Sequence, residues 1–266
     1  MDWGKIKTIF IIAFLILDIF LLTQLQVKKE QYEFTNGNTS IEENLKADGI
    51  KYGELPKEPV KDHYLSANTM TFTKEDLLDL KDQHIQLEGG KIIHSQLKEP
   101  FLVEKSDDHS DLDKFVENNI LHGDQYAFWD YNEEEGIITY YQQVDKKFLF
   151  MNQSAHLVFH LNSEGEIASY DQTMLDPIKS TGEEEKVLPP IQAIEALYHK
   201  GALSNCTIKD VNFGYYTLVN MEATQVLTPT WHILVKKDGV RMDMLVNAYE
   251  GTVIQGKPDK EKTILE

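Results

Sequence analysis

The feature that most constrains this chain is a long apolar run close to its start. Residues Thr8 to Leu25 are long enough for a helix of about 27 Å, close to the hydrocarbon core of a bilayer of about 30 Å. About thirteen Leu, Ile and Phe residues in this run favour insertion by roughly 4 to 8 kcal/mol, whereas Asp18 opposes it by about 2.5 to 3.5 kcal/mol. The balance predicts a transmembrane helix.

A secretory signal peptide also begins with positive charge and an apolar run, so the two fates must be separated. The segment Thr23–Glu30 has no small-x-small cleavage site and no lipobox cysteine, and we therefore expect an uncleaved anchor. Lysines lie on both sides of the run in nearly equal number, so the positive-inside rule decides little. Because long following domains translocate largely regardless of charge, we expect a single-pass protein in the cell membrane, with a cytoplasmic N-terminus and an extracytoplasmic C-terminal domain.

Charge and cysteine content narrow the classes of protein further. The formal net charge is −18, and the charges of residues 1–27 cancel, so the acidity belongs to the exterior part. An acidic surface without a basic stripe repels nucleic acid, which we exclude as a partner. Cys206 is the one cysteine, so no intrachain disulfide can form.

The rest of the chain predicts an α+β fold in an ectodomain of antiparallel sheets with helices packed on one face. β-branched and aromatic runs are separated by short turns, which indicates antiparallel pairing. Such runs cover residues 126–131, 137–144, 156–161 and 167–173, with further strands after residue 207 and a hairpin at Gly89-Gly90. Helix signals cover residues 41–47, 74–80 and 112–121 and the segment that begins at Pro190.

The segment Pro177–Pro190 is polar and acidic, and it predicts a linker between two units. We therefore expect four parts, which are a cytoplasmic start and transmembrane helix (1–27), a juxtamembrane segment (28–60) and two α+β ectodomain units (61–178 and 179–266). Leu161-Asn-Ser-Glu-Gly-Glu-Ile resembles Val246-Asn-Ala-Tyr-Glu-Gly-Thr-Val. The two units are therefore either duplicated subdomains or independent users of the same turn chemistry.

A search for catalytic or metal-binding chemistry gives no residue to assign. His156 and His160 lie four apart on a predicted strand, about 13 Å from each other, which is too far to share an ion. The acidic clusters lack an EF-hand pattern, which leaves a weak peripheral calcium site as an open alternative to solvent-facing charge. No nucleophile or phosphate-binding motif is present. We expect no enzyme, no cofactor and no metal.

Asp18 is the remaining unusual residue, because an ionisable side chain inside a membrane segment is a functional hypothesis by default. The alternative is that it faces lipid on a lone anchor. Positions spaced by three and four residues share one helix face and would meet a partner helix. This predicted partner-binding face consists of Ile11, Phe14, Leu15, Asp18, Leu21 and Leu22.

Two segments carry a resemblance to a known family. The opening Met1-Asp-Trp-Gly-Lys-Ile-Lys-Thr-Ile-Phe-Ile-Ile-Ala-Phe-Leu-Ile-Leu-Asp-Ile-Phe-Leu, with its acid inside the apolar run, is similar to the start of the YycI (WalI) family. The segment Leu157-Val-Phe-His-Leu-Asn-Ser-Glu-Gly-Glu-Ile-Ala-Ser-Tyr-Asp-Gln-Thr and the strand-rich C-terminal part resemble it as well.

The resemblance implies a non-enzymatic accessory regulator of the WalK/WalR (YycG/YycF) two-component system, which controls cell-wall metabolism. It implies contacts through membrane helices with a WalK-like sensor histidine kinase and with a YycH-like partner. The alternative function is a tethered extracytoplasmic ligand-binding or protease-inhibiting module, because Trp231–Gln255 looks like a PepSY-type strand pair.

Overall fold

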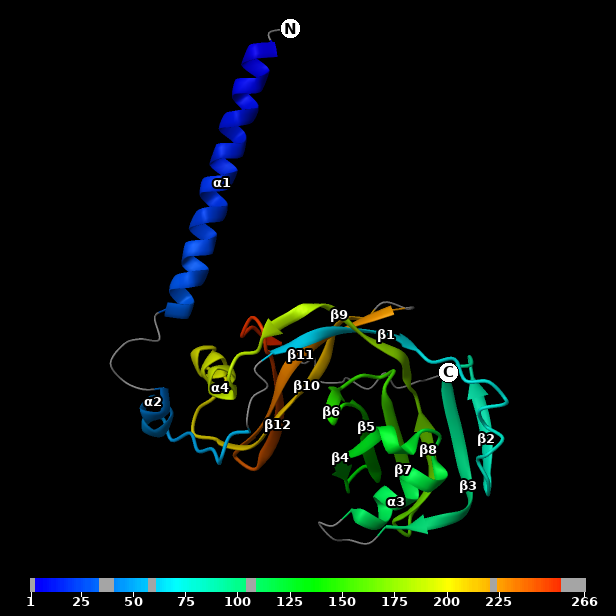
Figure 1. Cartoon of the computed structure of the whole chain (residues 1–266). Coiled ribbons are helices and arrows are strands. Elements are labelled where there is room, and N and C mark those ends of the chain that lie inside the picture. Colours follow the sequence, from blue (N-terminus) through cyan, green and yellow to red (C-terminus); the bar gives the residue numbers. More distant parts are fainter. Residues whose placement is uncertain (1–2, 34–40, 57–60, 104–108, 221–223, 255–266) are drawn as a thin grey trace. The chain divides into compact units, whose positions relative to one another are not determined.

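The computed structural model describes residues 3–33, 41–56, 61–103, 109–220 and 224–254. The chain forms two compact units, Met1–Lys51 and Tyr52–Glu266. The first unit contains the helices α1 (Trp3–Glu33) and α2 (Ile41–Ala47), and the second, called here the sheet domain, contains the strands (Figure 1). The expected fold class is confirmed, because one N-terminal apolar helix precedes a mostly antiparallel α+β domain.

Helix α1 is one continuous element of 31 residues, so it extends past the apolar run in both directions. At about 1.5 Å per residue its length is about 46 Å, which exceeds the hydrocarbon core of a bilayer. Helix α2 has the bounds that its capping pattern predicts, with Glu42 and Glu43 in the first turn and Lys46 in the last. These charges complement the helix dipole.

The elements of the sheet domain follow one another along the chain as strands with three short helical segments. They are β1 (Lys61–Thr69), β2 (Gln83–Glu88), β3 (Ile92–Leu102), α3 (Ser110–Asn119), the 3-10 helix η2 (Gly123–Gln125), β4 (Tyr126–Asn132), β5 (Ile137–Val144), β6 (Lys147–Phe150), β7 (His156–Leu161), β8 (Glu166–Gln172), β9 (Leu175–Lys186), α4 (Pro190–His199), β10 (Thr207–Asn220), β11 (Thr224–Lys237), β12 (Val240–Asn247) and β13 (Val253–Ile254).

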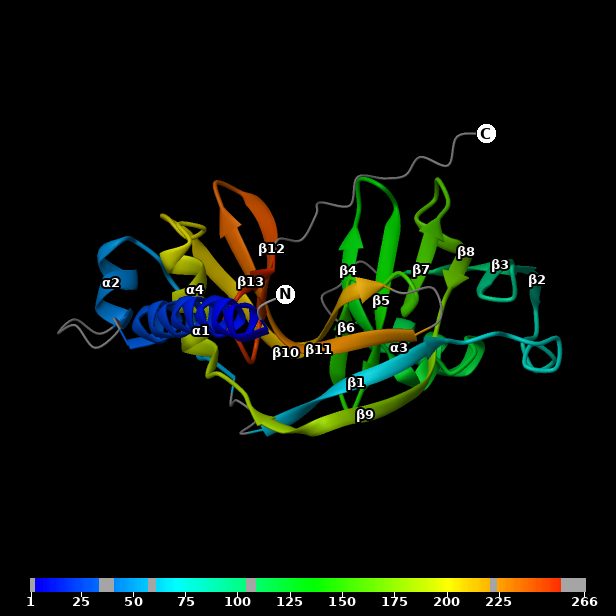
Figure 2. The ribbon, with the colours of Figure 1, turned by 90° about the horizontal axis from the view of Figure 1, so that it is seen from above.

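The strands form a 13-stranded sheet in the order β13-β12-β11-β10-β6-β5-β7-β8-β3-β2, with β1, β4 and β9 attached beside this path. The pairing of β10 with β6 is parallel, and the other ladders among the described residues are antiparallel. Strand β1 pairs with β11 on one side and with β9 on the other, and Figure 2 shows β1 and β9 running together. The parallel β6–β10 pair lies in the middle of this order and joins its two halves.

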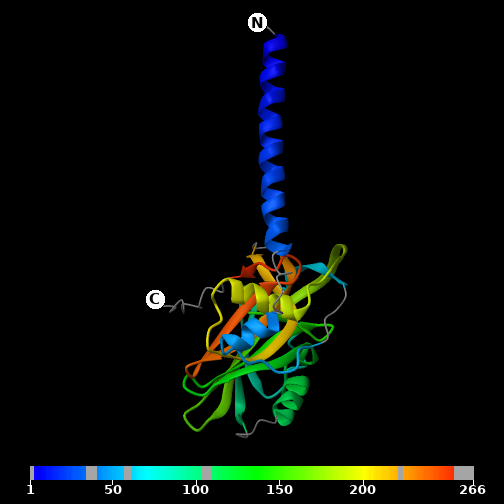
Figure 3. The same cartoon turned by 90° about the vertical axis from the view of Figure 1, so that its left-hand side faces the viewer.

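The two longer helices of the sheet domain lie at its opposite ends (Figures 1 and 3). Helix α3 buries Leu112 and Val116 in a core to which β3, β4, β5, β7 and β8 contribute buried side chains. Helix α4 begins at Pro190, as expected, and buries Ile194 and Leu197. The indole of Trp231 is fully buried, and its Nε1–H donates to the Leu188 carbonyl at 2.9 Å. Each end of the sheet thus has its own apolar packing.

The prediction of a helix over residues 74–80 is wrong, because this segment consists of turns. The expected cap is present, since the backbone N–H and the hydroxyl of Thr73 both donate to the Asp76 carboxylate, at 2.7 and 2.8 Å. The following backbone bonds, Leu78 to Glu75 and Leu80 to Leu77, span three residues rather than four. Bonds of this kind close successive turns and not the four-residue spacing of an α-helix, so the helix does not propagate beyond its cap.

The predicted linker within Pro177–Pro190 is also wrong as secondary structure, because most of it lies in β9. Thr181 pairs with Tyr64, and Glu185 pairs with Asp62. The side chains of this part of β9 are largely exposed, so the strand is held by backbone pairing with β1 and not by a buried face. Such a strand carries no alternation of apolar and polar residues, which is why the sequence pattern fails here.

The two similar segments of the sequence form the same kind of turn. The Asn162 carboxamide oxygen accepts from the N–H groups of Glu164 and Glu166, and that of Asn247 accepts from Tyr249 and Glu250. A third asparagine, Asn132, bonds its turn in the same way. Each turn ends in a glycine with positive φ, at positions 136, 165 and 251. Local turn chemistry is therefore sufficient to produce the likeness.

The expected part boundaries at residues 27, 60 and 178 remain predictions, as does the duplication of two subdomains. Strand β9 runs through residue 178 without interruption.

Candidate functional site

The predicted partner-binding face lies on a helix that has the properties of a membrane span. Residues Ile6–Gln24 of α1 form a stretch of 19 residues with a mean hydropathy of 2.4, of which none is buried by the rest of the chain. Apolar side chains surround the helix on every side, as expected of a segment in contact with lipid. A helix of this length and composition is compatible with a single-pass membrane anchor.

All six residues of the predicted face are exposed along α1. The exposed fractions of Ile11, Phe14 and Leu15 are 65%, 60% and 56%, and those of Leu21 and Leu22 are 54% and 58%. The residues on the opposite side, such as Phe20 at 56%, are equally exposed. What distinguishes the predicted face is therefore Asp18, which has no hydrogen-bond or ion-pair partner among the described residues.

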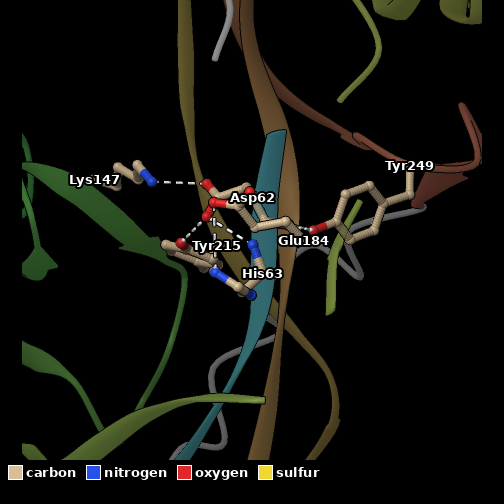
Figure 4. A network of polar contacts seen from close by, with 6 residues as sticks. All are labelled: Asp62, His63, Lys147, Glu184, Tyr215 and Tyr249. Carbon is tan, nitrogen blue, oxygen red and sulfur yellow. Dashed lines mark hydrogen bonds and ion pairs between the residues drawn. The ribbon is translucent and has the colours of Figure 1, made fainter. Parts of the chain in front are cut away.

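In contrast to Asp18, the sheet domain contains a buried carboxylate that has hydrogen-bond partners. This carboxylate belongs to Asp62, at the start of β1 (Figure 4). Asp62 is 6% exposed. Its Oδ2 lies 2.7 Å from the Lys147 ammonium, and its Oδ1 accepts from the Tyr215 hydroxyl at 2.9 Å and from the backbone N–H of His63 at 2.8 Å. The Tyr249 hydroxyl donates to the backbone carbonyl of Asp62 at 2.5 Å. Both carboxylate oxygens are thus satisfied within the chain.

The surroundings of Asp62 keep its tyrosine partners neutral. Burial, followed by the charge of Asp62, raises the pKa of Tyr215, and the same two causes raise the pKa of Tyr249. The Lys147 ammonium also lies 5.6 Å from the ring centroids of Phe213 and Tyr215, which adds cation–π contacts. Neutral hydroxyls and a lysine are suited to hold a carboxylate, not to activate it.

A second carboxylate network lies on the β2–β3–β8–β7 part of the sheet. Asp171 accepts from His94 Nδ1 at 2.5 Å and from His160 Nε2 at 2.8 Å, and His94 Nε2 lies 2.8 Å from Glu88. The pKa of His94 is raised, chiefly by its hydrogen bond to Asp171. Burial opposes ionisation of Asp171, but the hydrogen bonds from both histidines together lower the pKa of Asp171.

A third polar contact joins β11 to β12. The imidazole of His232 is buried, and its Nε2 lies 2.7 Å from Asp243 while Nδ1 has no hydrogen-bond partner. The Trp129 ring of β4 packs against the His232 ring at 4.7 Å. The hydrogen bond from His232 is the main cause that lowers the pKa of Asp243. This histidine packs among aromatic rings.

These networks were missed in the sequence because their members come from distant strands. His160 shares the Asp171 carboxylate with His94, which lies 66 positions earlier in the numbering but two strands away in the sheet. His156 and His160 do not converge. Among the described residues no group of three potential ligands could hold a metal ion. Burial raises the pKa of the Cys206 thiol, which makes it a poor nucleophile.

One apolar helix of membrane-spanning length, followed by a separate sheet domain, fits the class of single-pass membrane proteins with a separate folded domain. The chain belongs to the YycI protein family, whose model matches residues 29–249. The expected family is thereby confirmed. The family consists of accessory regulatory proteins, not enzymes, and it is linked to the YycG/WalK two-component system.

Comparisons with other known proteins are more distant. No curated protein matches the sequence. The crystal structure of an uncharacterized protein from Eubacterium rectale ATCC 33656 is similar at 11% identity with a TM-score of 0.49, covering 79% of this chain and 92% of that chain. The C-terminal domain of Bacillus megaterium YpeB is similar at 12% identity with a TM-score of 0.40, covering 75% of this chain and 85% of that chain. Likeness at this level assigns no function.

Proposed function

We propose that this chain regulates a WalK (YycG)-like sensor histidine kinase through contacts between membrane helices, together with a YycH-like partner, and thereby acts on cell-wall metabolism without catalysing a reaction. The observation that carries the proposal is Asp18, a carboxylate inside the otherwise apolar stretch Ile9–Leu22 of α1, which has no partner within the described chain. A polar side chain in lipid is costly when it is alone and stabilising when another helix supplies its hydrogen bond.

The contact surface in this proposal is the face through Ile11, Phe14, Leu15, Asp18, Leu21 and Leu22. Spacing by three and four residues is the pattern of left-handed helix pairs, in which side chains of one helix fit between those of the other. A polar residue within such a seam fixes the register of the two helices. Asp18 would then select the partner, while the apolar residues on either side provide the packing.

The matched pair Phe14 and Phe20 tests the face. Both are phenylalanines on α1 with similar exposure, 60% and 56%. Phe14 lies on the proposed face, whereas Phe20 lies about 160° around the helix from Asp18, because two residues turn an α-helix by about 200°. We expect Phe14→Ala to reduce co-purification of the kinase and to change the expression of kinase-controlled genes. Phe20→Ala is the control and leaves both unchanged. Equal effects of the two substitutions would contradict a contact on this face.

The proposal also fixes the orientation, with the N-terminus in the cytoplasm and the sheet domain outside. Leu78 is 76% exposed, whereas Cys206, the single native cysteine, is 4% exposed and gives little background. A membrane-impermeant maleimide added to intact cells should label Leu78→Cys and leave the parent chain unlabelled. Labelling that requires lysis of the cells would place the sheet domain in the cytoplasm and overturn this orientation.

The alternative is a tethered ligand-binding or protease-inhibiting module that acts through the sheet domain. It predicts that residues 31–266, secreted without the membrane helix, still regulate the system. The helix-contact proposal predicts that this soluble form is inactive even though it is folded.

A further inference from the structure

We propose that Asp62 is a positioning residue that fastens β1, and with it the chain arriving from the membrane unit, to the core of the sheet domain. The inference rests on the proposed function, because it concerns how a movement of the membrane helix reaches the sheet domain. It assigns a role to the network of Figure 4 that the helix contact alone does not require.

The first step is connectivity. The first compact unit ends at Lys51, and β1 begins at Lys61 as the first strand of the sheet domain. Because the backbone is continuous, one path by which a displacement of the first unit reaches the sheet domain runs along this connection and then through β1. The attachment of β1 therefore affects how a displacement along this path is passed to the sheet domain.

The second step is that the backbone ladder attaches the start of β1 poorly. The described β1 residues pair with β9 and β11, but pairing with β11 covers Leu65 to Asn68 and does not reach the start of the strand. On the β9 side, the register shifts between Asp62 and Tyr64. Among the described strands, β9 is paired only with β1. The backbone hydrogen bonds to β9 therefore do not connect the start of β1 to the rest of the sheet.

The third step is that Asp62 provides the missing attachment. Its carboxylate reaches Lys147 of β6 and Tyr215 of β10, and its backbone carbonyl accepts from Tyr249 after β12. None of these three elements is a ladder neighbour of β1. The strands β6 and β10 pair with each other in parallel, so the two side-chain contacts end on the junction at the middle of the sheet.

A purely structural role for a buried ion pair is the simpler explanation, and the network of Asp171 offers a matched comparison. Asp171 also accepts hydrogen bonds from two side chains, His94 and His160. Its partners lie on β3 and β7, both of which are already ladder neighbours of β8, the strand of Asp171. Removing the Asp171 carboxylate therefore weakens the sheet domain without releasing β1.

The experiment uses the full-length chain in lipid nanodiscs for hydrogen exchange and the same variants in cells for regulation. Tyr215→Phe combined with Tyr249→Phe removes two of the fastening hydrogen bonds and keeps the rings, so the domain should still fold. Asp62→Asn is the stronger variant, and Lys147→Arg keeps the charge and should behave as the parent. Asp171→Asn is the control.

We expect the tyrosine variants to increase amide exchange in β1 by about tenfold or more, with little change in β10 and β11. Asp62→Asn should increase exchange in β1 more than in β10 and β11, because it also lowers the stability of the whole domain. Regulatory output should be lost while the kinase still co-purifies, because the helix face is intact. Asp171→Asn should keep the output. Unchanged exchange in β1, retained output in the tyrosine variants, or loss of output in Asp171→Asn would each overturn the proposal.

This design separates the two proposals. If Phe14→Ala removes co-purification and output while the tyrosine variants keep both, the helix contact stands and the role of Asp62 falls. If Phe14→Ala changes neither, the proposed function itself falls.

Discussion

Two carboxylates in this chain stand in opposite surroundings. Asp62 is buried in the sheet domain and satisfied by Lys147, Tyr215 and the backbone of His63. Asp18 lies on an exposed apolar helix and has no partner among the described residues. A buried charge is tolerated when the same chain supplies its partners, and an acid in lipid gains most from a partner on another molecule. The first acid therefore serves the fold, and the second indicates an interaction outside it.

The largest expected effect is the loss of stability on removing the carboxylate of Asp62, the acid whose partners lie within the chain. Asp62→Ala leaves Lys147 without its partner, and removing one member of a buried pair costs about 3 to 5 kcal/mol. We expect this loss in the free energy of unfolding, measured by denaturant titration of the full-length chain in detergent. The double variant Asp62→Leu with Lys147→Met should recover much of it, because no charge is left unpaired. If Asp62→Ala unfolds like the parent, the contrast between the two acids fails.

A second prediction concerns the parallel junction on which the Asp62 network rests. A Cβ atom added at Gly214 in β10 would clash with the Phe148 carbonyl and would lie 2.7 and 2.9 Å from ring atoms of Phe150. We expect Gly214→Ala to destabilise the sheet domain by about 1 to 3 kcal/mol through overpacking. Gly239→Ala is the control and should destabilise the domain less. No atom lies within 4 Å of a Cβ added there, so only the strain of its positive φ remains. Thermal unfolding of both variants tests the difference.

The unsatisfied acid should behave in the opposite way. Asp18→Leu should leave the unfolding of the sheet domain unchanged within about 0.5 kcal/mol, because it removes no contact there. It should weaken the kinase interaction by about 3- to 20-fold, the range measured for single polar contacts between membrane helices. Asp18→Asn keeps a polar side chain and should retain more binding than Asp18→Leu. Quantitative co-purification from membranes measures the order, and equal binding of all three chains argues against a polar contact.

The smallest expected effect is the pH dependence of stability that comes from Asp171 and His94, whose charges are partly exposed to solvent. The raised pKa of His94 means that its stabilising contribution is fully present below the unfolded-state pKa of about 6.5 and is lost as pH rises through the folded-state value. The lowered pKa of Asp171 adds a contribution that is present above about pH 4 and is lost in stronger acid. Because the groups are part exposed, the total should stay below about 1 kcal/mol.

The pH dependence of unfolding checks this last prediction by comparing the parent chain with His94→Gln. The difference in stability should be larger at pH 5 than at pH 8.5. A difference that is independent of pH would mean that His94 is not charged in its contact with Asp171.

The sequence predicts those features that depend on neighbours in the chain. The apolar run gives α1, the capping residues give α2, Pro190 gives the start of α4, and turn residues give the hairpins. It fails where long-range pairing decides, as in β9, whose exposed residues Thr181–Lys186 form a strand because β1 lies beside them. The networks of Asp62 and Asp171 escape sequence analysis for the same reason, since their members are 85 and 77 positions apart.

The candidate site divides in the same way. The face of α1 follows from helical periodicity, so it could be named residue by residue from the sequence. The partner helix could not be predicted in this way. The pattern shows that Asp18 has no partner on its own helix, but the residues that would contact it belong to another chain.

The most direct measurement of the central claim is site-specific photocrosslinking around α1 in living cells. A photoreactive amino acid is placed in turn at Phe14, Leu21, Ile16 and Phe20, which sample the proposed face and its opposite side. The account predicts that adducts with the sensor kinase or the YycH-like partner form from Phe14 and Leu21 and are absent from Ile16 and Phe20. Adducts of equal yield from all four positions, or none from Phe14 and Leu21, would contradict it.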